Sequence, residues 1–343
     1  MAVAVDITFH PSWWYANAGV RFNEDFFCSP QYRMEADIKM RKSLYERFGD
    51  AGLGEKDPGP RPIMGSDLIA SGYLFSQIMG CEVRFSEGNP PEVLCANLPD
   101  DRALSLKMPE LAENRYWKNT LDQFEYLESR YGYVESHINL QGVQNIAMDL
   151  RGSELFIDYY EKPKIAENLI RECAGLMLEA GREIRKRSKV MSHGVTAITR
   201  KVMPDVYLTS NCSVEMISQG NYEDFLLQAD RRLAEEFKPF GIHHCGKTME
   251  HVAEGYKKVK DLAFAEVGAG SDVLKVRQAL PGVFLNLRYS PVRIKTATEE
   301  EMTQDLQKMA KAAGTRFSVS CVGIDADTED QQIKQFITCV GNL

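Results

Sequence analysis

The sequence has no run of about 18 consecutive apolar residues, the length that a membrane-spanning helix needs. Its first residues also lack the basic stretch and long apolar stretch of a secretory signal. Basic residues are not in excess, because 41 Lys and Arg stand against 49 Asp and Glu and leave a formal net charge of -8. These absences predict a cytoplasmic protein that binds neither membranes nor nucleic acid.

Several nucleotide-binding and hydrolase motifs are missing as well. There is no GxGxxG after a predicted strand, no GxxxxGK[ST] and no GxSxG. A dinucleotide-binding fold, a P-loop and a serine hydrolase therefore have no support. The 8 cysteines are scattered along 343 residues without the compact spacing of a disulfide framework. We predict that they are reduced thiols, in keeping with a cytoplasmic protein.

What the sequence does contain is a regular alternation of short apolar runs with amphipathic helical stretches. The predicted strands are residues 62–68, 133–140, 205–209, 241–245, 263–267, 283–287 and 317–322. The predicted helices are residues 32–48, 115–131, 164–187, 222–237, 249–259 and 299–313. Such alternation is typical of parallel strands joined by helices. This many candidate strands favour an α/β fold of the TIM (β/α)8 barrel type over a smaller open sheet.

The first 61 residues are more irregular and rich in aromatic side chains. These include Trp13, Trp14, Tyr15 and Phe26. We therefore divide the chain into an N-terminal arm and helix, residues 1–61, which cover a barrel formed by residues 62–343. Two interpretations of the arm remain open. Its rings either pack as a lid over one end of the barrel or also line a pocket for an aromatic ligand.

A His-x-Cys pair ends one of the predicted strands, in Gly241-Ile242-His243-His244-Cys245-Gly246. Residues two apart on a strand point to the same face, so His243 and Cys245 can aim at one point. A further cysteine, Cys321, lies in a later predicted strand. One imidazole with two thiolates is a good zinc set, and three protein ligands leave one position open for chemistry. A closed structural site, with Cys212 or His251 as a fourth ligand, is the alternative.

Other polar side chains follow or close the predicted strands. Active sites of such barrels lie at the C-terminal ends of the strands, so these side chains are predicted to share one rim. The candidates for catalysis are Glu266, Asn211 and His137. The candidates for substrate binding are Asn139 and Arg288, together with the aromatic residues of the arm.

The motifs His243-His244-Cys245-Gly246 and Val319-Ser320-Cys321-Val322-Gly323 resemble the uroporphyrinogen decarboxylase superfamily, in its branch of zinc-dependent corrinoid methyltransferases. The resemblance runs through most of the chain from about residue 62. It implies a TIM barrel with a catalytic zinc ion on His243, Cys245 and Cys321 and with Glu266 near the metal. The arginine-rich N-terminal motif of the true decarboxylases is missing, and the late cysteine is foreign to them. Porphyrinogen decarboxylation is therefore the weakest of the implied activities.

The resemblance implies transfer of a methyl group between a small molecule and a corrinoid (cobalamin) carried by a partner protein. Because Trp13, Trp14, Tyr15 and Phe26 can wall a flat ring, we favour a methoxylated aromatic donor, and hence O-demethylation. The alternative is a methylcobalamin:thiol methyltransferase of the coenzyme M type, with Arg288 or Lys247 holding a sulfonate. A homodimer is compatible with either activity. A module that only binds zinc or corrinoid would show affinity without turnover.

Overall fold

The computed structural model describes residues 3–191 and 196–343. Its strands are Val5–Phe9 (β1), Ile63–Gly65 (β2), Glu82–Arg84 (β3), Glu92–Leu94 (β4), Glu135–His137 (β5), Val190–Met191 (β6), Tyr207–Ser210 (β7), Phe240–His244 (β8), Leu262–Val267 (β9), Phe284–Arg288 (β10) and Phe317–Ile324 (β11). A six-stranded parallel sheet runs in the order β1-β11-β10-β9-β8-β7, and a three-stranded parallel sheet in the order β2-β5-β6. The antiparallel hairpin β3-β4 belongs to neither sheet.

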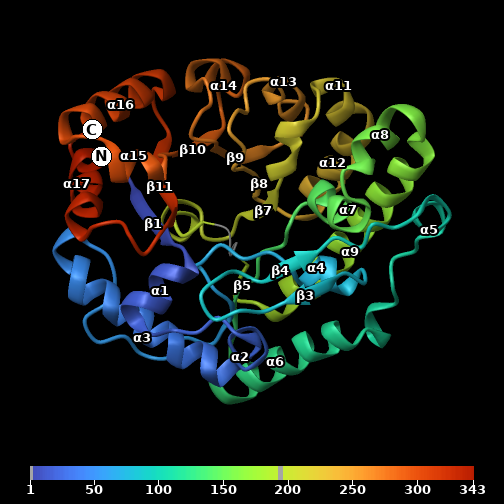
Figure 1. The fold of residues 1–343 in the computed structure, drawn as a ribbon, viewed down its shortest axis with the longest axis horizontal. Coiled ribbons are helices and arrows are strands. Elements are labelled where there is room, and N and C mark those ends of the chain that lie inside the picture. The colour runs from blue at the N-terminus through green and yellow to red at the C-terminus, as the bar shows by residue number, and fades with distance from the viewer. Residues whose placement is uncertain (1–2, 192–195) are drawn as a thin grey trace.

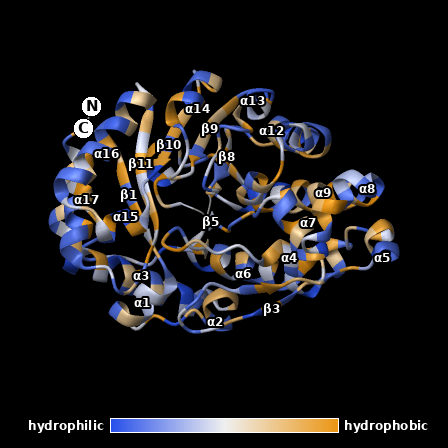
Figure 2. Cartoon of the chain, turned by 45° about the horizontal axis from the view of Figure 1, so that its top comes forward, coloured by the Kyte–Doolittle hydropathy of each residue, from blue (hydrophilic) through white to orange (hydrophobic). Residues whose placement is uncertain are grey.

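Helices surround the strands, so that the sheets form the inside of a ring (Figure 1). The α-helices are Pro11–Ala18 (α1), Glu24–Cys28 (α2), Pro30–Phe48 (α3), Leu74–Ile78 (α4), Asp100–Ser105 (α5), Arg115–Tyr131 (α6), Val143–Arg151 (α7), Glu154–Glu161 (α8), Pro163–Arg187 (α9), Thr199–Val202 (α10), Gln219–Asn221 (α11), Leu227–Glu236 (α12), Ala253–Tyr256 (α13), Val273–Ala279 (α14), Pro291–Thr296 (α15), Glu299–Ala313 (α16) and Asp330–Gly341 (α17). Hydrophobic residues gather on the strands and the inward helix faces (Figure 2). Of the helices described, none has both the length and the apolar character to cross a membrane.

The strands and helices predicted from periodicity are confirmed. The predicted strands correspond to β2, β5, β7, β8, β9, β10 and β11. The predicted helices correspond to α3, α6, α9, α12, α13 and α16. Helix α12 is preceded by a wider π-type turn, Tyr222–Leu226, and α13 is shorter than predicted. These helices could be located from the sequence because each of them buries a set of apolar side chains.

The closed eight-stranded barrel is not confirmed. Backbone hydrogen bonds among the described residues join the strands into a curled six-stranded sheet and a separate three-stranded sheet. In the part of the chain that the structure describes, the end of β7 is linked to the segment after β5 by a backbone hydrogen bond from the N–H of Ser210 to the carbonyl of Gln141 and by a side-chain contact between Ser210 and Asn139. Charged side chains bridge the other junction, between β1 and β2. The fold is therefore a parallel half-barrel with a second sheet beside it.

Strand β1 is a feature that the sequence analysis missed. It pairs in parallel with β11, which places part of the first 61 residues inside the main sheet. The side chains of this strand alternate between two faces. Ile7 and Phe9 belong to a hydrophobic cluster, while Asp6 and Thr8 are buried on the opposite face. A strand of five residues with a buried carboxylate gives only a weak hydrophobic signal, and this explains the miss.

The rings of α1 form a hydrophobic core with β1 and α3. The ring centroid of Trp13 lies 4.2 Å from that of Phe9 and 4.9 Å from that of Trp14. Trp13 and Trp14 both have 0% of their surface exposed, and Phe48 packs against Trp13 from α3. This packing accounts for the aromatic richness of the segment, because such rings bury large apolar areas.

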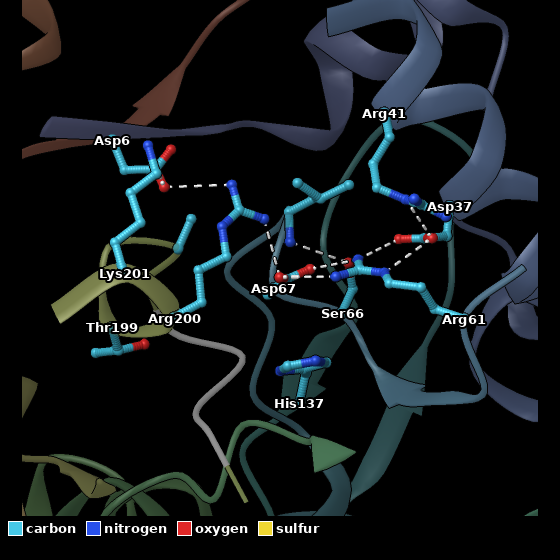
Figure 3. Close-up of polar contacts among 12 residues, drawn as sticks. Asp6, Asp37, Arg41, Arg61, Ser66, Asp67, His137, Thr199, Arg200 and Lys201 are labelled. Carbon is cyan, nitrogen blue, oxygen red and sulfur yellow. Dashed lines mark hydrogen bonds and ion pairs between the residues drawn. The ribbon is translucent and has the colours of Figure 1, made fainter. Parts of the chain in front are cut away.

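The buried charges that span the two sheets form a chain of ion pairs (Figure 3). Arg200 of α10 contacts Asp6 of β1 at 3.2 Å and Asp67, just after β2, at 2.9 Å. Arg61 then joins Asp67 at 2.9 Å to Asp37 of α3. Burial alone would raise the pKa of Asp67, but Arg61 and Arg200 outweigh it and hold that pKa well below its usual range. The carboxylate therefore stays ionised between the two sheets.

Candidate metal centre

Three potential metal ligands meet beside the ends of β7 and β8. The ligand atoms of Cys212, His243 and Cys245 all lie within 4.8 Å of one another. His243 is part of β8, and Cys245 follows the last residue of that strand. Cys212 opens a short helical turn, Cys212–Met216, directly after β7. Because the two strands are parallel neighbours, their C-terminal ends bring these side chains to one place.

The strand register places a polar layer around His243. Ser210 of β7 pairs with His243, which in turn pairs with Glu266 of β9, and Glu266 pairs with Asn286 of β10. Paired residues of parallel strands point to the same face of the sheet. Their four side chains are buried on that face, at the level of the candidate metal ligands.

Glu266 controls the charge of His243. Its Oε2 lies 2.9 Å from the Nδ1 of His243, an ion-pair contact that lacks hydrogen-bond alignment. Burial lowers the pKa of His243, but Glu266 and the Cys245 thiolate more than compensate and raise it to about 9. The Nε of Arg288 approaches Glu266 from the other side, at 3.4 Å from Oε1. Glu266 is therefore placed to orient the imidazole, a role common for carboxylates behind metal-bound histidines.

The two thiols of the group differ in acidity. The hydrogen bond between them lowers the pKa of Cys245 and raises that of Cys212, and His243 lowers that of Cys245 further. Cys245 is therefore the thiolate of the pair in the absence of a metal. Since thiolates rather than thiols bind metals, this polarised pair suits a soft cation.

The group opens into a cavity of about 700 Å³, which we call the metal cavity. Its wall includes Cys212, His243, Cys245 and Arg288, and residues from several separate loops complete it. Exposed Met216 also belongs to the wall. Cavities of this size accommodate a small organic molecule. A substrate in this space can therefore contact the candidate ligands directly.

Cys321 is not part of this group. On β11, Ser318 and Ser320 exchange hydrogen bonds with the side chain of Asn286, so they lie on the inner face of the sheet. Cys321 is the neighbour of Ser320 and takes the outer face. There it has 0% of its surface exposed and packs in the same hydrophobic cluster as Phe336 of α17. Burial raises the pKa of its thiol to about 12.

Asn211 lies behind the metal cavity rather than in it. Its side chain donates a 2.8 Å hydrogen bond to Oδ2 of Asp230, which also accepts one from the hydroxyl of Tyr222. Its backbone N–H donates to the carbonyl of His243, also at 2.8 Å. Asn211 therefore fixes the end of β7 against β8 and, with it, the position of Cys212.

Asp230 should make stability fall as the pH rises. Burial raises its pKa to about 6 despite the two hydrogen bonds, whereas an unfolded aspartate has a pKa of about 3.9. The stability advantage is thus full below pH ~4 and is lost as the pH rises through about 6. Relative to Asp230→Asn, the wild type should lose about 2 kcal/mol between pH 4 and pH 8, as measured by urea unfolding.

Asp224→Asn is the matched control for this experiment, because Asp224 is exposed in the segment just before α12. We expect its stability to follow that of the wild type at both pH values. An equal pH dependence in wild type and Asp230→Asn would show that the buried carboxyl titrates normally.

The remaining predicted site residues are dispersed. His137 and Asn139 line a second cavity of about 600 Å³, which shares Asn139 and Ser71 with the metal cavity. Neither cavity is lined by Trp13, Trp14 or Phe26, which are buried in the core. Tyr15 also lines neither cavity and is 44% exposed. From the sequence, Cys212 was considered only as a fourth ligand. Its position directly after a predicted strand already placed it at the same C-terminal rim of the sheet as His243 and Cys245.

No protein-family model and no curated protein matches this chain. Among solved structures, the chain is similar to a methyltransferase from Methanosarcina mazei, with 14% identity, a TM-score of 0.68 and coverage of 99% of this chain and 94% of the other. A B12-independent methionine synthase from Shewanella sp. W3-18-1 is 12% identical, with a TM-score of 0.48 and coverage of 99% and 96%. At 14% identity, the similarity to the first structure establishes a shared fold and nothing more. The similarity to the second structure is too weak to support a conclusion.

Proposed function

We propose that this chain is a zinc-dependent methyltransferase that moves a methyl group from a small methylated compound to the cobalt of a corrinoid protein. The main support for this proposal is the group of Cys212, His243 and Cys245, which faces a cavity at the ends of the strands. The fold shared with a Methanosarcina mazei methyltransferase supports the same reading. We retain a methoxylated aromatic compound as the favoured donor, which makes the activity an O-demethylation.

The three side chains fit zinc by chemistry and by distance. Zn–S bonds of about 2.3 Å and Zn–N bonds of about 2.0–2.1 Å place the ligand atoms of a tetrahedral Cys-His-Cys set roughly 3.5–3.8 Å apart. The observed atoms lie within 4.8 Å of one another, so small side-chain movements complete the set. A zinc ion held there would supply a Lewis acid next to the substrate.

The chain's own residues have separate tasks in this proposal. Glu266 holds the imidazole of His243 in one orientation, and Arg288 keeps positive charge beside the ligands. In the reaction the methyl–oxygen bond breaks, its electron pair remains on the oxygen, and that oxygen takes up a proton. The new carbon bond forms with an electron pair supplied by reduced cobalt. A positive guanidinium near the leaving oxygen favours this separation of charge.

A second candidate is transfer of the methyl group from methylcobalamin to a small anionic thiol. The observation in its favour is Arg288, a nearly buried cation that lines the metal cavity beside Cys245. A guanidinium there suits a sulfonate or carboxylate on the thiol. The two candidates share the metal site and differ in substrate.

The deciding experiment follows the spectrum of cob(I)alamin with zinc-loaded protein and 4-methoxybenzoate. We expect conversion to methylcobalamin, and we expect Glu266→Gln to lower the rate about 10–100-fold without losing zinc. Consumption of methylcobalamin by a thiol, with no reaction of the aryl ether, would instead establish the second candidate. Absence of both reactions in zinc-loaded protein would refute the proposal.

A further inference from the structure

The second cavity, which we call the aromatic chamber, has a wall of aromatic rings. Phe27 of α2, Tyr73 before α4 and Phe85 after β3 contact one another, with ring centroids 5.2–5.5 Å apart. Tyr116 of α6 completes the aromatic part of the wall. The chamber has a volume of about 600 Å³. Rings in edge-to-face and tilted contact around such a space are suited to a planar ring.

A buried cation without an anionic partner also lines the chamber. Arg33 is 1% exposed, and its Nε and Nη1 donate to the backbone carbonyls of Ile63, Phe26 and Phe27. The acceptor that the described residues offer to its Nη2 is a weak one, the Sδ of Met64 at 3.3 Å. Within residues 3–191 and 196–343, no carboxylate forms an ion pair with it. Since a buried charge is costly unless it is paired, this guanidinium favours an anion in the chamber.

Two further side chains of the wall have unused hydrogen-bonding capacity. Gln123 donates from Nε2 to Asn119, but no described residue donates to its buried Oε1. Among residues 3–191 and 196–343, neither ring nitrogen of buried His137 has a hydrogen-bond partner, and Oε2 of Glu135 lies 3.7 Å from Nε2. Buried polar groups are rarely left unsatisfied, so these atoms indicate polar substituents on the occupant.

The chamber adjoins the metal cavity. Ser71 and Asn139 line both spaces. Oδ1 of Asn139 lies 3.5 Å from the hydroxyl of Ser210, and Ser210 pairs with His243. One molecule can therefore lie in the chamber and extend a substituent past Asn139 towards the candidate metal ligands.

We propose that the aromatic chamber binds the ring of an aromatic carboxylate, with the carboxylate at Arg33 and the ring among Phe27, Tyr73 and Phe85. The exposed charged residues at the rim are Glu24, Glu82 and Arg115, and Glu82 forms an ion pair with Arg84 at 3.4 Å. The inference that an aromatic carboxylate binds here depends only on the residues of the chamber and not on the metal site. Its identification with the site of a methoxylated aromatic acid, the methyl donor, rests on the proposed function.

The test is calorimetric titration with 4-hydroxybenzoate. Cyclohexanecarboxylate keeps the charge without the flat ring, and benzyl alcohol keeps the ring without the charge. We expect both to bind at least about 10-fold more weakly than 4-hydroxybenzoate, which corresponds to a loss of ~1.4 kcal/mol. Equal binding of the three ligands, or no binding of 4-hydroxybenzoate, would overturn the proposal.

Variants locate the bound ring. Phe85→Ala, at a partly exposed position, and Arg33→Gln should each weaken binding about 10-fold or more. Tyr15→Ala is the matched control, since Tyr15 is an exposed ring outside both cavities. If Arg33→Gln does not fold, the proposal is tested by Phe85→Ala and by the comparison of the three ligands. Wild-type affinity in Phe85→Ala would overturn the proposal.

A metal-site variant separates this inference from the proposed function. In His243→Ala, which lacks a candidate metal ligand, 4-hydroxybenzoate should still bind within about threefold of wild-type affinity. Retained binding would support the chamber even if methyl transfer failed in every assay. Binding lost together with the metal would place the ring at the metal and overturn the chamber as its site.

Discussion

Replacing Cys212 with serine should lower the zinc affinity about 100-fold or more, whereas replacing Cys321 with serine should leave it within about threefold of wild type. Cys212 has its thiol within 4.8 Å of the His243 and Cys245 ligand atoms. Cys321 packs in a hydrophobic cluster on the outer face of β11. The measurement is competition for zinc against a chromophoric chelator, with both variants checked for native circular dichroism.

This pair of variants decides between two ligand sets. The resemblance to corrinoid methyltransferases implied Cys321 as the third ligand, while the structure brings Cys212 to His243 and Cys245. Loss of zinc in Cys321→Ser with retention in Cys212→Ser would restore the first set. It would also require β11 to shift by one residue, because only that movement turns Cys321 to the inner face.

Replacing Arg61 with methionine should lower the free energy of unfolding by about 2–3 kcal/mol, because it removes the cation shared by two buried carboxylates and leaves Asp67 only Arg200 and Asp37 only Arg41. Asp37 and Asp67 are 2% and 3% exposed, and Arg61 contacts both. Urea unfolding at pH 7 measures the loss. Since the folded-state pKa of Asp67 is depressed, its contribution to stability is present above about pH 4 and is lost as the pH falls through the folded-state value.

An exposed ion pair provides the control for this experiment. Lys334 of α17 lies 2.9 Å from Asp50, whose side chain is 68% exposed. Lys334→Met should leave the free energy of unfolding nearly unchanged, because solvent screens the pair. A similarly small loss in Arg61→Met would mean that the ion-pair chain does not hold the two sheets together.

The candidate site could be predicted from the sequence as far as local spacing reaches. His243 and Cys245 are two residues apart on one strand, so strand geometry alone brings them together. Glu266 lies beside His243 because neighbouring parallel strands end at the same rim. Which cysteine joins them depends on the face of β11 that meets the cavity. That choice is set by packing against α17 and by the serines that bond Asn286, and neither leaves a periodic signal.

The aromatic residues illustrate a second limit of the sequence. Trp13 and Phe27 both belong to the aromatic-rich first 61 residues, yet Trp13 is buried in the core and Phe27 lines a cavity. Composition predicts that rings cluster, but the tertiary arrangement decides which ones surround a space. The partners of Phe27 in the chamber wall, Tyr73 and Phe85, come from segments that showed no strong pattern of their own.

The pairing of β1 with β11 imposes an order on folding during synthesis. β1 leaves the ribosome long before β11, and β11 is its backbone partner in the sheet. Contacts between segments so distant along the chain form slowly, because closing a long loop costs entropy. Until then β1 is unpaired, and the open edge of β10 can pair with another nascent chain. Chaperone binding to this protein should therefore be strongest just before β11 emerges.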